Sequence, residues 1–454
     1  MRRQFGPARA QEHKVYGYSP VNIKQKFFLF TIFAFYGPSI KIIGEFRVIE
    51  ILVIIFLVFN LGAALRNLGK YEKRLIGFFL LAALAHIVAD IITDASIDGT
   101  LKRAGTYIVL SLLLVGLSWL ARGNPVRMIW MLAGYCFSYL VVFLFNVETP
   151  SRGYLEAPWR LGLGMASTLG VTLFIALLPR YERIGAFALL ALGGIHWLLD
   201  ARTLAALSVA TGFLVFWASF RTQPLPSTFR PFAVARFAAL AIAGLVCLNY
   251  GLELATKHQL FTEQMQKKME MQLANPYGLI GGGRPEFVVA LLAISKSPLW
   301  GHGSTNVDPD VYYLYASLSA ETYSHLGDYK GFLEQKLAQE WVLGTPSHSH
   351  LLGAWADAGV FASLCWFLVI GSCGYVLVRL MLWRHRFMPL VVLIVLATMW
   401  DVLFSPGPTR MDMAFRLLVL TFAVNTLRAF DLRLKQNHKA GKSAPPPNPH
   451  AGIP

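Results

Sequence analysis

Three polar, glycine-rich pieces of sequence lie between residues 281 and 359. Residues 281–286 read Gly-Gly-Gly-Arg-Pro-Glu, residues 297–303 read Ser-Pro-Leu-Trp-Gly-His-Gly, and residues 347–359 read Ser-His-Ser-His-Leu-Leu-Gly-Ala-Trp-Ala-Asp-Ala-Gly. They interrupt a chain that is otherwise mostly apolar. The sequence therefore predicts a polar centre that is held by a frame of apolar helices.

The composition of the chain is that of a membrane protein. The 454 residues are 55% hydrophobic and 15% charged, whereas soluble globular domains carry about 25% charged residues. Apolar runs of about 18 or more residues recur along most of the sequence, and each is a candidate transmembrane helix. We therefore expect an all-α, polytopic membrane protein.

The formal net charge of +16 raises the question of a nucleic-acid partner. The lysines and arginines, however, lie mainly in short segments between apolar runs, where positive charge fixes the orientation of the spans and meets anionic lipid. We expect membrane lipid as a partner and no nucleic acid. All four cysteines fall inside apolar runs, which favours neither a disulfide framework nor a thiol metal site; they are Cys136, Cys247, Cys365 and Cys373.

Apolar runs and basic loops together predict about twelve transmembrane helices, with both ends of the chain in the cytoplasm. The strongly basic loop 66–74 is placed on the cytoplasmic side, and the loops that carry acidic and mixed residues alternate with the basic ones. The expected spans are residues 27–42, 47–65, 75–94, 104–121, 125–146, 158–178, 184–200, 203–220, 231–254, 353–378, 388–404 and 409–427.

This span count divides the chain into five parts. Between the ninth and tenth spans lies one large extracytoplasmic loop, in which helices are expected at 259–273 and 287–294. Both are too short to cross the bilayer, so we expect them at the interface or over the mouth of the bundle. The parts are a basic cytoplasmic tail (1–26), an N-terminal transmembrane bundle (27–254), the loop (255–352), C-terminal transmembrane helices (353–427) and a disordered cytoplasmic tail (428–454).

Two arginines on the extracytoplasmic side are candidates for binding an anion. Arg202 lies between two spans, although it could also be a turn residue that sets topology, paired with Asp200. Arg284 follows Gly283 and two further glycines. Glycine lets backbone N–H groups approach an anion, and arginine can hold phosphate oxygens with two hydrogen bonds. The alternative for this second segment is a flexible loop. His196 is expected to be a buried structural histidine.

Two histidines open the span after the large loop. A neutral imidazole of His348 or His350 could accept a proton from a hydroxyl group, or both could serve only polar packing at the helix start with the neighbouring serines. Arg410 could add positive charge at the same face or only anchor a helix end. A metal site is a weaker alternative, because apart from His-x-His no ligand spacing is present; its members would be His302, Asp308, Asp310, His348 and His350.

The surroundings of three of these residues resemble the O-antigen ligase and O-antigen polymerase superfamily. The stretch Asp-Ala-Arg202-Thr-Leu-Ala-Ala-Leu is similar to the arginine that opens an apolar mid-chain helix in that family. Gly-Arg284 is similar to the start of its large periplasmic loop, and residues 297–303 are similar to its Pro-Leu-x-Gly-x-Gly turn. His348, followed by Leu352 and by Asp-Ala-Gly359, is similar to its His-Asn-x-x-Leu…Glu-x-Gly pattern.

The chain departs from the family pattern in three places. Ser349 stands where asparagine is common, and Asp357 stands where glutamate is common. Because two histidines stand close together in His-x-His, either could correspond to the family histidine. The spacing to Leu352 and to the glycine that ends the motif favours His348 over His350.

The resemblance implies a GT-C-like glycosyltransferase fold and an undecaprenyl-diphosphate-linked glycan as donor. It implies an inverting transfer on the periplasmic face of the bacterial inner membrane, without metal or cofactor, and lipid A-core is the acceptor that we favour. In this picture His348, Arg284 and Arg202 are catalytic. His350, Gly283 and Arg410 would bind substrate.

Several related functions stay open at this point. Within the family, the chain could instead be a polymerase that joins O-antigen or exopolysaccharide repeat units, or an oligosaccharyltransferase that acts on protein. An alternative from another functional class is a transporter for lipid-linked oligosaccharide. Transporters, however, often show repeated halves, and this sequence shows no such repeat. The identity of the glycan and the oligomeric state are not predicted.

Overall fold

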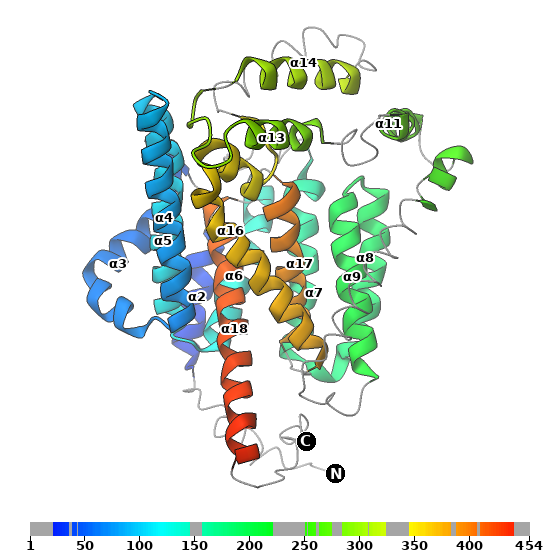
Figure 1. Cartoon of the computed structure of the whole chain (residues 1–454). Helices are drawn as coiled ribbons and strands as arrows, with labels where there is room; N and C mark the ends of the chain where they lie inside the picture. The colour runs from blue at the N-terminus through cyan, green and yellow to red at the C-terminus, as the bar shows by residue number, and fades with distance from the viewer. Residues whose placement is uncertain are drawn as a thin grey trace, which may run out of the picture.

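The computed structural model shows a helical bundle with a layer of short helices over one end (Figure 1). We call the end drawn at the top of Figure 1 the upper end and the opposite one the lower end. The residues that the structure describes are 21–35, 39–42, 44–145, 157–220, 250–259 without 252, 263–274, 284–323 without 307, 345–382, 387–405 and 409–439.

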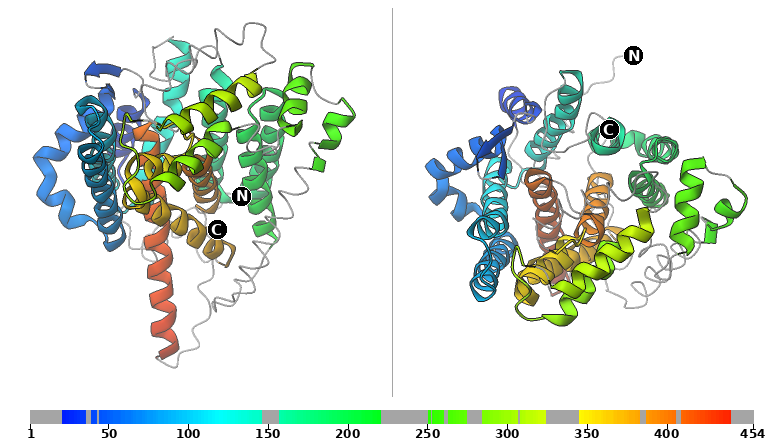
Figure 2. Two further views of the ribbon diagram at one scale, coloured as in Figure 1. Left: turned by 45° about the horizontal axis from the view of Figure 1, so that its top comes forward. Right: turned by 90° about the horizontal axis from the view of Figure 1, so that it is seen from above.

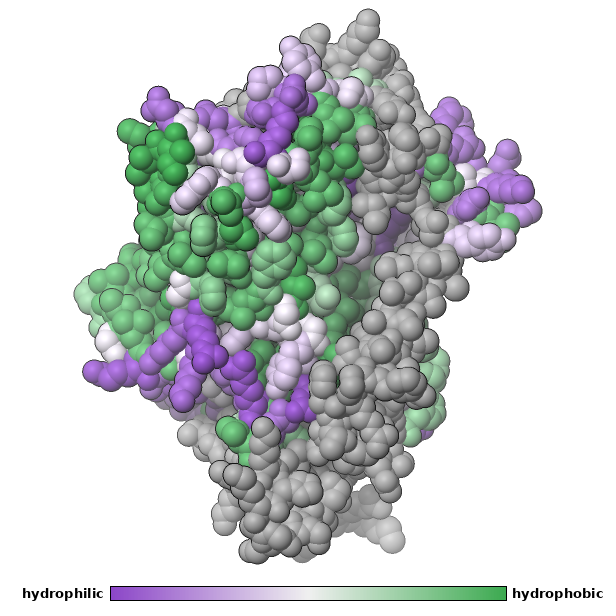
Figure 3. Space-filling view, in the orientation of Figure 1, coloured by the Kyte–Doolittle hydropathy of each residue, from purple (hydrophilic) through white to green (hydrophobic). Residues whose placement is uncertain are grey.

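The predicted class of all-α membrane protein is confirmed. Among the described residues, seven helices are long enough and apolar enough to cross a membrane, and two apolar helices are shorter. On the face that Figure 3 shows, a broad hydrophobic band crosses the bundle, with hydrophilic groups above and below it. The seven are α3 (Val48–Asn67), α4 (Lys70–Ile92), α5 (Ile97–Ala121), α6 (Pro125–Leu144), α9 (Arg202–Ser219), α16 (His350–Leu382) and α18 (Arg410–Lys439), and the two shorter ones are α7 (Gly164–Leu177) and α17 (Met388–Phe404).

Large apolar side chains face outward on these helices, as lipid-facing surfaces require. Phe59 of α3 is 83% exposed, and Ile91 of α4 is 76% exposed. A soluble monomer rarely exposes such large contiguous apolar patches. The remaining helical elements of the bundle are α2 (Ile23–Ala34), η1 (Trp159–Leu163), η2 (Pro179–Tyr181) and α8 (Glu182–Leu198).

The prediction of a first span at 27–42 is wrong. Helix α2 ends at Ala34, and its 12 residues extend only about 18 Å, less than the roughly 30 Å of a hydrocarbon core. Strands β1 (Ser39–Ile42) and β2 (Gly44–Arg47) follow and pair antiparallel. The Gly-Pro pair at 37–38 is the sequence feature that disfavours a continued helix. Most of the expected span 231–254 lies outside the described residues.

The C-terminal helix is longer than the apolar pattern predicted. Helix α18 continues to Lys439, past residue 428, where we expected a disordered tail to begin. Hydropathy marks where a helix leaves the membrane, but the residues that follow are mostly good helix formers and can continue it. Arg379 of α16 pairs with Asp431, and the hydroxyl of Tyr375 donates to the same carboxylate at 3.3 Å. These contacts hold the extension against α16.

Helices α17 and α18 form the centre of the bundle when it is viewed from above (Figure 2). The first eleven residues of α17 are buried except for Leu396. Because this helix is apolar on all sides, it cannot face water, and its neighbours α7, α9, α16 and α18 enclose it. The core of the bundle therefore lies around α17.

A layer of short helices covers the upper end. Helix α13 (Pro285–Lys296) packs on helix α14 (Pro309–Tyr323) and on the start of α16. Helix α11 (Glu263–Ala274) lies to the side near α8 and α9 (Figure 1). Helices therefore occur in both places where the sequence predicted short ones. An apolar cluster joins the layer to the bundle; it consists of Val289, Ala290, Ala293, Ile294, Val311, Tyr315, Leu318, Leu352 and Ala356.

Helix α16 is interrupted by a kink at Gly359. This residue has φ +73° and ψ −175°, a conformation that is essentially restricted to glycine. A Cβ atom there would lie 1.8 Å from the carbonyl oxygen of Leu299. The kink is therefore the place where the loop after α13 touches the backbone of α16.

Three backbone hydrogen bonds hold that loop on the kink. The N–H of Val360 donates to Pro298 at 3.1 Å. The N–H groups of His302 and Gly303 donate to the carbonyls of residues 356 and 357 at 2.9 and 2.8 Å. The Pro-Leu-x-Gly-x-Gly turn and the Asp-Ala-Gly motif thus form one junction, which we call the loop–kink junction. It fixes α13 relative to α16.

Two buried acidic side chains hold this region together: one ties the same loop to α4, and the other ties α16 to α5. Asp90 of α4 accepts hydrogen bonds from the backbone N–H and the hydroxyl of Ser304, at 2.5 and 2.7 Å. Asp357 of α16 is 1% exposed and lies 3.2 Å from the guanidinium of Arg103 on α5. A buried carboxylate needs such partners. The loop is therefore fastened to α4 as well as to α16.

Candidate functional site

The three residues predicted to be catalytic all lie at the upper end of the bundle. Arg202 is the first residue of α9, Arg284 directly precedes α13, and His348 lies two residues before α16. Helices α9 and α16 both run downward from this end in Figure 1, and α13 lies across it. The three residues share this end because each lies at or just before the start of a helix that begins there.

His348 contacts a buried carboxylate. Its Nε2 atom lies 3.3 Å from Oε1 of Glu286, whose side chain is 4% exposed, while the histidine side chain is 31% exposed. Glu286 is in the first turn of α13, and His348 lies in the loop before α16. The contact depends on the packing of α13 against α16. His348 also has φ +43°, a left-handed conformation that is uncommon for residues other than glycine.

The pairing with Glu286 selects one tautomer of His348. A carboxylate can only accept, so Nε2 carries the proton and donates it toward Oε1. Nδ1 then holds the lone pair of the neutral ring. A carboxylate in this position also stabilises the protonated ring, as the third member of catalytic triads does. The pair is therefore suited to accept a proton.

Arg284 is two residues before Glu286 and occupies the N-cap position of α13. Its carbonyl accepts a hydrogen bond from the N–H of Phe287 at 3.0 Å, which begins the helix. The positive end of a helix dipole favours anions beside it. A cation and a proton acceptor are thus brought to the start of one helix. Gly283 lies outside the described residues.

Arg202 faces a different neighbour. Its guanidinium lies 3.4 Å from Oδ1 of Asp200 and 3.4 Å from the sulfur of Met269 on α11. The structure therefore pairs Arg202 with Asp200, as the turn-residue alternative supposed, and it also places α11 over this arginine. Among the described residues, its polar contacts do not include the His348–Glu286 pair.

The structure separates the two histidines of the His-x-His pair by their surroundings. The ring of His350 stacks on Trp366, with ring centres 4.8 Å apart. Its Nε2 atom is enclosed and makes no hydrogen bond within the described part of the chain. His350 begins the span, whereas the carboxylate partner belongs to His348. This difference favours His348 as the proton acceptor.

Arg410 has an ion-pair partner on α3. Its Nη2 atom lies 3.2 Å from Oε2 of Glu50, which is 1% exposed, and its guanidinium stacks over Phe46 at 4.4 Å. The contact joins the start of α18 to the start of α3. The geometry favours the interpretation that Arg410 anchors a helix end.

The residues of the metal alternative are engaged with other groups. His302 Nε2 lies 2.9 Å from the carbonyl oxygen of Ala293. Asp308 and Asp310 lie 2.7 and 2.5 Å from Nζ of Lys296. Hydrogen bonds to these carboxylates raise the pKa of Lys296, and the ammonium lowers the pKa of Asp308. Within the described ranges, no group of three or more His, Cys, Asp or Glu side chains is placed to hold a metal ion.

His196 has the structural role that the sequence suggested. Its Nδ1 accepts a hydrogen bond from the indole N–H of Trp159 at 3.0 Å. Nε2 therefore carries the proton and donates to the hydroxyl of Thr168 at 2.8 Å, which in turn donates to the carbonyl of Gly164. The buried histidine is satisfied on both sides and joins η1, α7 and α8.

Sequence reasoning missed two partners at the upper end. They are Glu286, which stands two residues after Arg284, and Arg103 of α5. The signal for Glu286 was present, because a glutamate in the first turn of an apolar helix is an ionisable group near membrane depth. For Arg103 there was no signal, because its partner Asp357 is far away in the sequence.

Comparison of the chain with protein-family models, with curated proteins and with solved structures finds no match.

Proposed function

We propose that the upper end of the bundle transfers a glycan from undecaprenyl diphosphate to an acceptor hydroxyl, as the family resemblance implies. The observation that carries this proposal is the 3.3 Å contact between His348 and Glu286, two residues after Arg284. The site would then face the periplasm, within a GT-C-like membrane fold. We favour lipid A-core as the acceptor and the bacterial inner membrane as the location.

The proposed reaction is a single displacement. The oxygen of the acceptor hydroxyl attacks the anomeric carbon, and its proton passes to Nδ1 of His348. The bond between the anomeric carbon and the diphosphate oxygen breaks, and the electron pair leaves with the diphosphate. Arg284, together with Arg202 once the donor bridges the two, offsets the charge on this leaving group.

Glu286 would act as a positioning residue in this reaction. Its carboxylate holds the His348 ring in one tautomer and stabilises the imidazolium that forms. Nδ1 is enclosed in the structure, so the ring or its neighbours must move when the acceptor binds. Catalytic hydrogen bonds often form only in the substrate complex.

The test is transfer by the purified full chain in proteoliposomes with carrier-linked glycan and lipid A-core. We expect His348→Ala and Arg284→Ala to abolish transfer and release of undecaprenyl diphosphate, with insertion unchanged. Removal of a general base typically lowers the rate by about 10²- to 10⁴-fold. Loss in His350→Ala with full activity in His348→Ala would move the base to His350. Ser317→Ala, on the exposed part of α14, is the control and should keep full activity.

Glu286→Gln tests the positioning role. The amide keeps the size of the side chain but cannot stabilise an imidazolium, so we expect a fall in kcat with little change in KM. The acidic limb of the pH profile should move to lower pH, a change that mere loss of stability would not produce. An unchanged profile would show that Glu286 is only a packing residue.

Products distinguish the related functions. A ligase joins the glycan to lipid A-core and releases the carrier, whereas a polymerase lengthens the carrier-linked chain. A transporter leaves the glycan on its carrier and moves it across the vesicle membrane. Movement without bond cleavage would refute the proposed transfer.

A further inference from the structure

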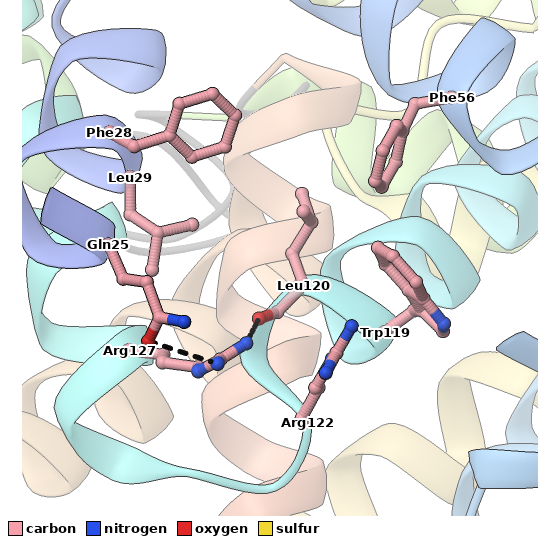
Figure 4. Close-up of a pocket in the computed structure, with 8 residues that line it drawn as sticks. All are labelled: Gln25, Phe28, Leu29, Phe56, Trp119, Leu120, Arg122 and Arg127. Carbon is pink, nitrogen blue, oxygen red and sulfur yellow. Dashed lines mark hydrogen bonds between the residues drawn. The ribbon is translucent and has the colours of Figure 1, made fainter. Parts of the chain in front are cut away.

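A separate cavity lies at the lower end, between the start of α2, helix α3 and the turn that joins α5 to α6 (Figure 4). Its volume is about 210 Å³. The ends of α2, α5 and α6 meet here, and Arg127 of α6 reaches the side chain of Gln25 on α2. This cavity is at the opposite end of the bundle from the His348–Glu286 pair, so an inference about it does not rest on the proposed function.

Two guanidinium groups border the cavity. Arg127 donates from Nη1 to the carbonyl of Leu120 at 3.4 Å and from Nη2 to Oε1 of Gln25 at 3.3 Å. Arg122 lies over the ring of Trp119 at 4.9 Å. In Figure 4 the two guanidiniums lie on either side of Leu120. Among the described residues that line the cavity none is acidic, so both charges remain available to an anion.

The other walls of the cavity are apolar and continue into the lipid-facing surface. Phe28 and Phe56 lie at the end away from the guanidiniums (Figure 4), and their side chains are 55% and 38% exposed. On α3 the neighbouring Val58 and Phe59 are also exposed. A ligand in this cavity would therefore meet positive charge at one end and hydrocarbon at the other.

The surface around the cavity has the same sign of charge. Helices α2, α3 and α4 begin or end here, and their terminal lysines and arginines are exposed, whereas Glu72 is only 9% exposed and bonds to Asn425 at 2.8 Å. Basic pockets between membrane helices attract anionic lipid headgroups. The exposed cations are Lys24, Arg66, Lys70, Lys73, Arg74 and Arg122.

We propose that this cavity binds an anionic membrane phospholipid, with the phosphate between Arg122 and Arg127 and an acyl chain along Phe28 and Phe56. Arginine can hold phosphate oxygens with two hydrogen bonds. The aromatic rings supply the apolar contact that a soluble phosphate compound could not use. A bound lipid would join α2 and α3 to the α5–α6 turn.

The variant Arg122→Asn isolates the headgroup contact. Arg122 has φ +49° at the end of α5, and asparagine tolerates this left-handed conformation better than most residues. The substitution therefore removes the guanidinium with little strain on the backbone. Arg74→Asn is the matched control, because Arg74 is an exposed arginine in the basic surface at the same end but does not line the cavity.

The experiment measures the binding of fluorescent phosphatidylglycerol, and of phosphatidylcholine for comparison, to the purified full chain in detergent. We expect phosphatidylglycerol to be preferred, and Arg122→Asn to weaken its binding about tenfold, as loss of a charge-assisted hydrogen bond implies. Arg74→Asn should change binding less than about twofold, in line with an exposed charge. Gln25→Glu is a second test of the same charge, because it sets a carboxylate beside Arg127, and it should weaken binding of phosphatidylglycerol by a similar factor.

Three results would overturn the proposal. Equal loss in Arg122→Asn and Arg74→Asn would mean that diffuse surface charge attracts the lipid. Equal binding of both lipids would remove the role of the headgroup charge. Displacement of the fluorescent lipid by millimolar glycerol phosphate would mean that the cavity takes a soluble phosphate compound. Melting temperatures of the variants show that any loss is not unfolding.

Discussion

Gly359→Ala should break the loop–kink junction. Alanine would have to adopt φ +73° and ψ −175°, and its Cβ would overlap the carbonyl oxygen of Leu299. Holding a residue other than glycine in this region costs about 1–3 kcal/mol, and each of the three hydrogen bonds of the junction contributes about 1 kcal/mol. If the loop detaches, the free energy of unfolding of this region should fall by on the order of 5 kcal/mol.

Hydrogen exchange of the full chain in detergent measures this effect directly. We expect the amides of His302, Gly303 and Val360 to exchange much faster in Gly359→Ala, with a lower melting temperature. Gly371→Ala is the matched control on the same helix, because nothing lies within 4 Å of the added Cβ. It should be neutral or stabilise the helix by up to about 1 kcal/mol. If these amides were equally protected from exchange in Gly359→Ala and Gly371→Ala, the junction would not depend on glycine at position 359.

Two further predictions concern ion pairs at the upper end. Arg103→Leu leaves the Asp357 carboxylate buried without its cation and should lower the free energy of unfolding, measured by denaturant titration, by about 3 kcal/mol. The double variant with leucine at both positions should recover most of this loss. If the double variant recovers nothing, Arg103 acts through packing alone. Lys296→Met should speed hydrogen exchange at the start of α14, since it removes the partner of Asp308 and Asp310. The pKa of Asp308 is lowered and that of Lys296 is raised by their contact. The difference in exchange rate between the variant and the unchanged protein should therefore be constant near neutral pH, shrink as the pH falls below about 4, and shrink again only above about pH 10. A difference that is largest in acid would contradict the ion pair.

Local sequence predicts most of the helices, but hydropathy alone does not show that the helix expected at 27–42 ends at Ala34. Helices α4, α6 and α17 lie within a few residues of the runs that the sequence predicted, because each satisfies its own backbone hydrogen bonds in an apolar setting. The apolar run at 27–42 instead contains both a short helix and a strand. Hydropathy reports the preference for lipid, but turn residues and hairpin pairing decide the backbone.

The sequence by itself determined the class of protein, most of its helices and the polar region in which the candidate residues lie. It placed Arg202, Arg284 and His348 near helix starts, which is a local property of apolar runs and their polar ends. Only the tertiary structure decided which side chains meet: His348 with Glu286, and Arg103 with Asp357. Such pairs depend on how distant helices cross, and contact between distant segments leaves no mark in the spacing of either one.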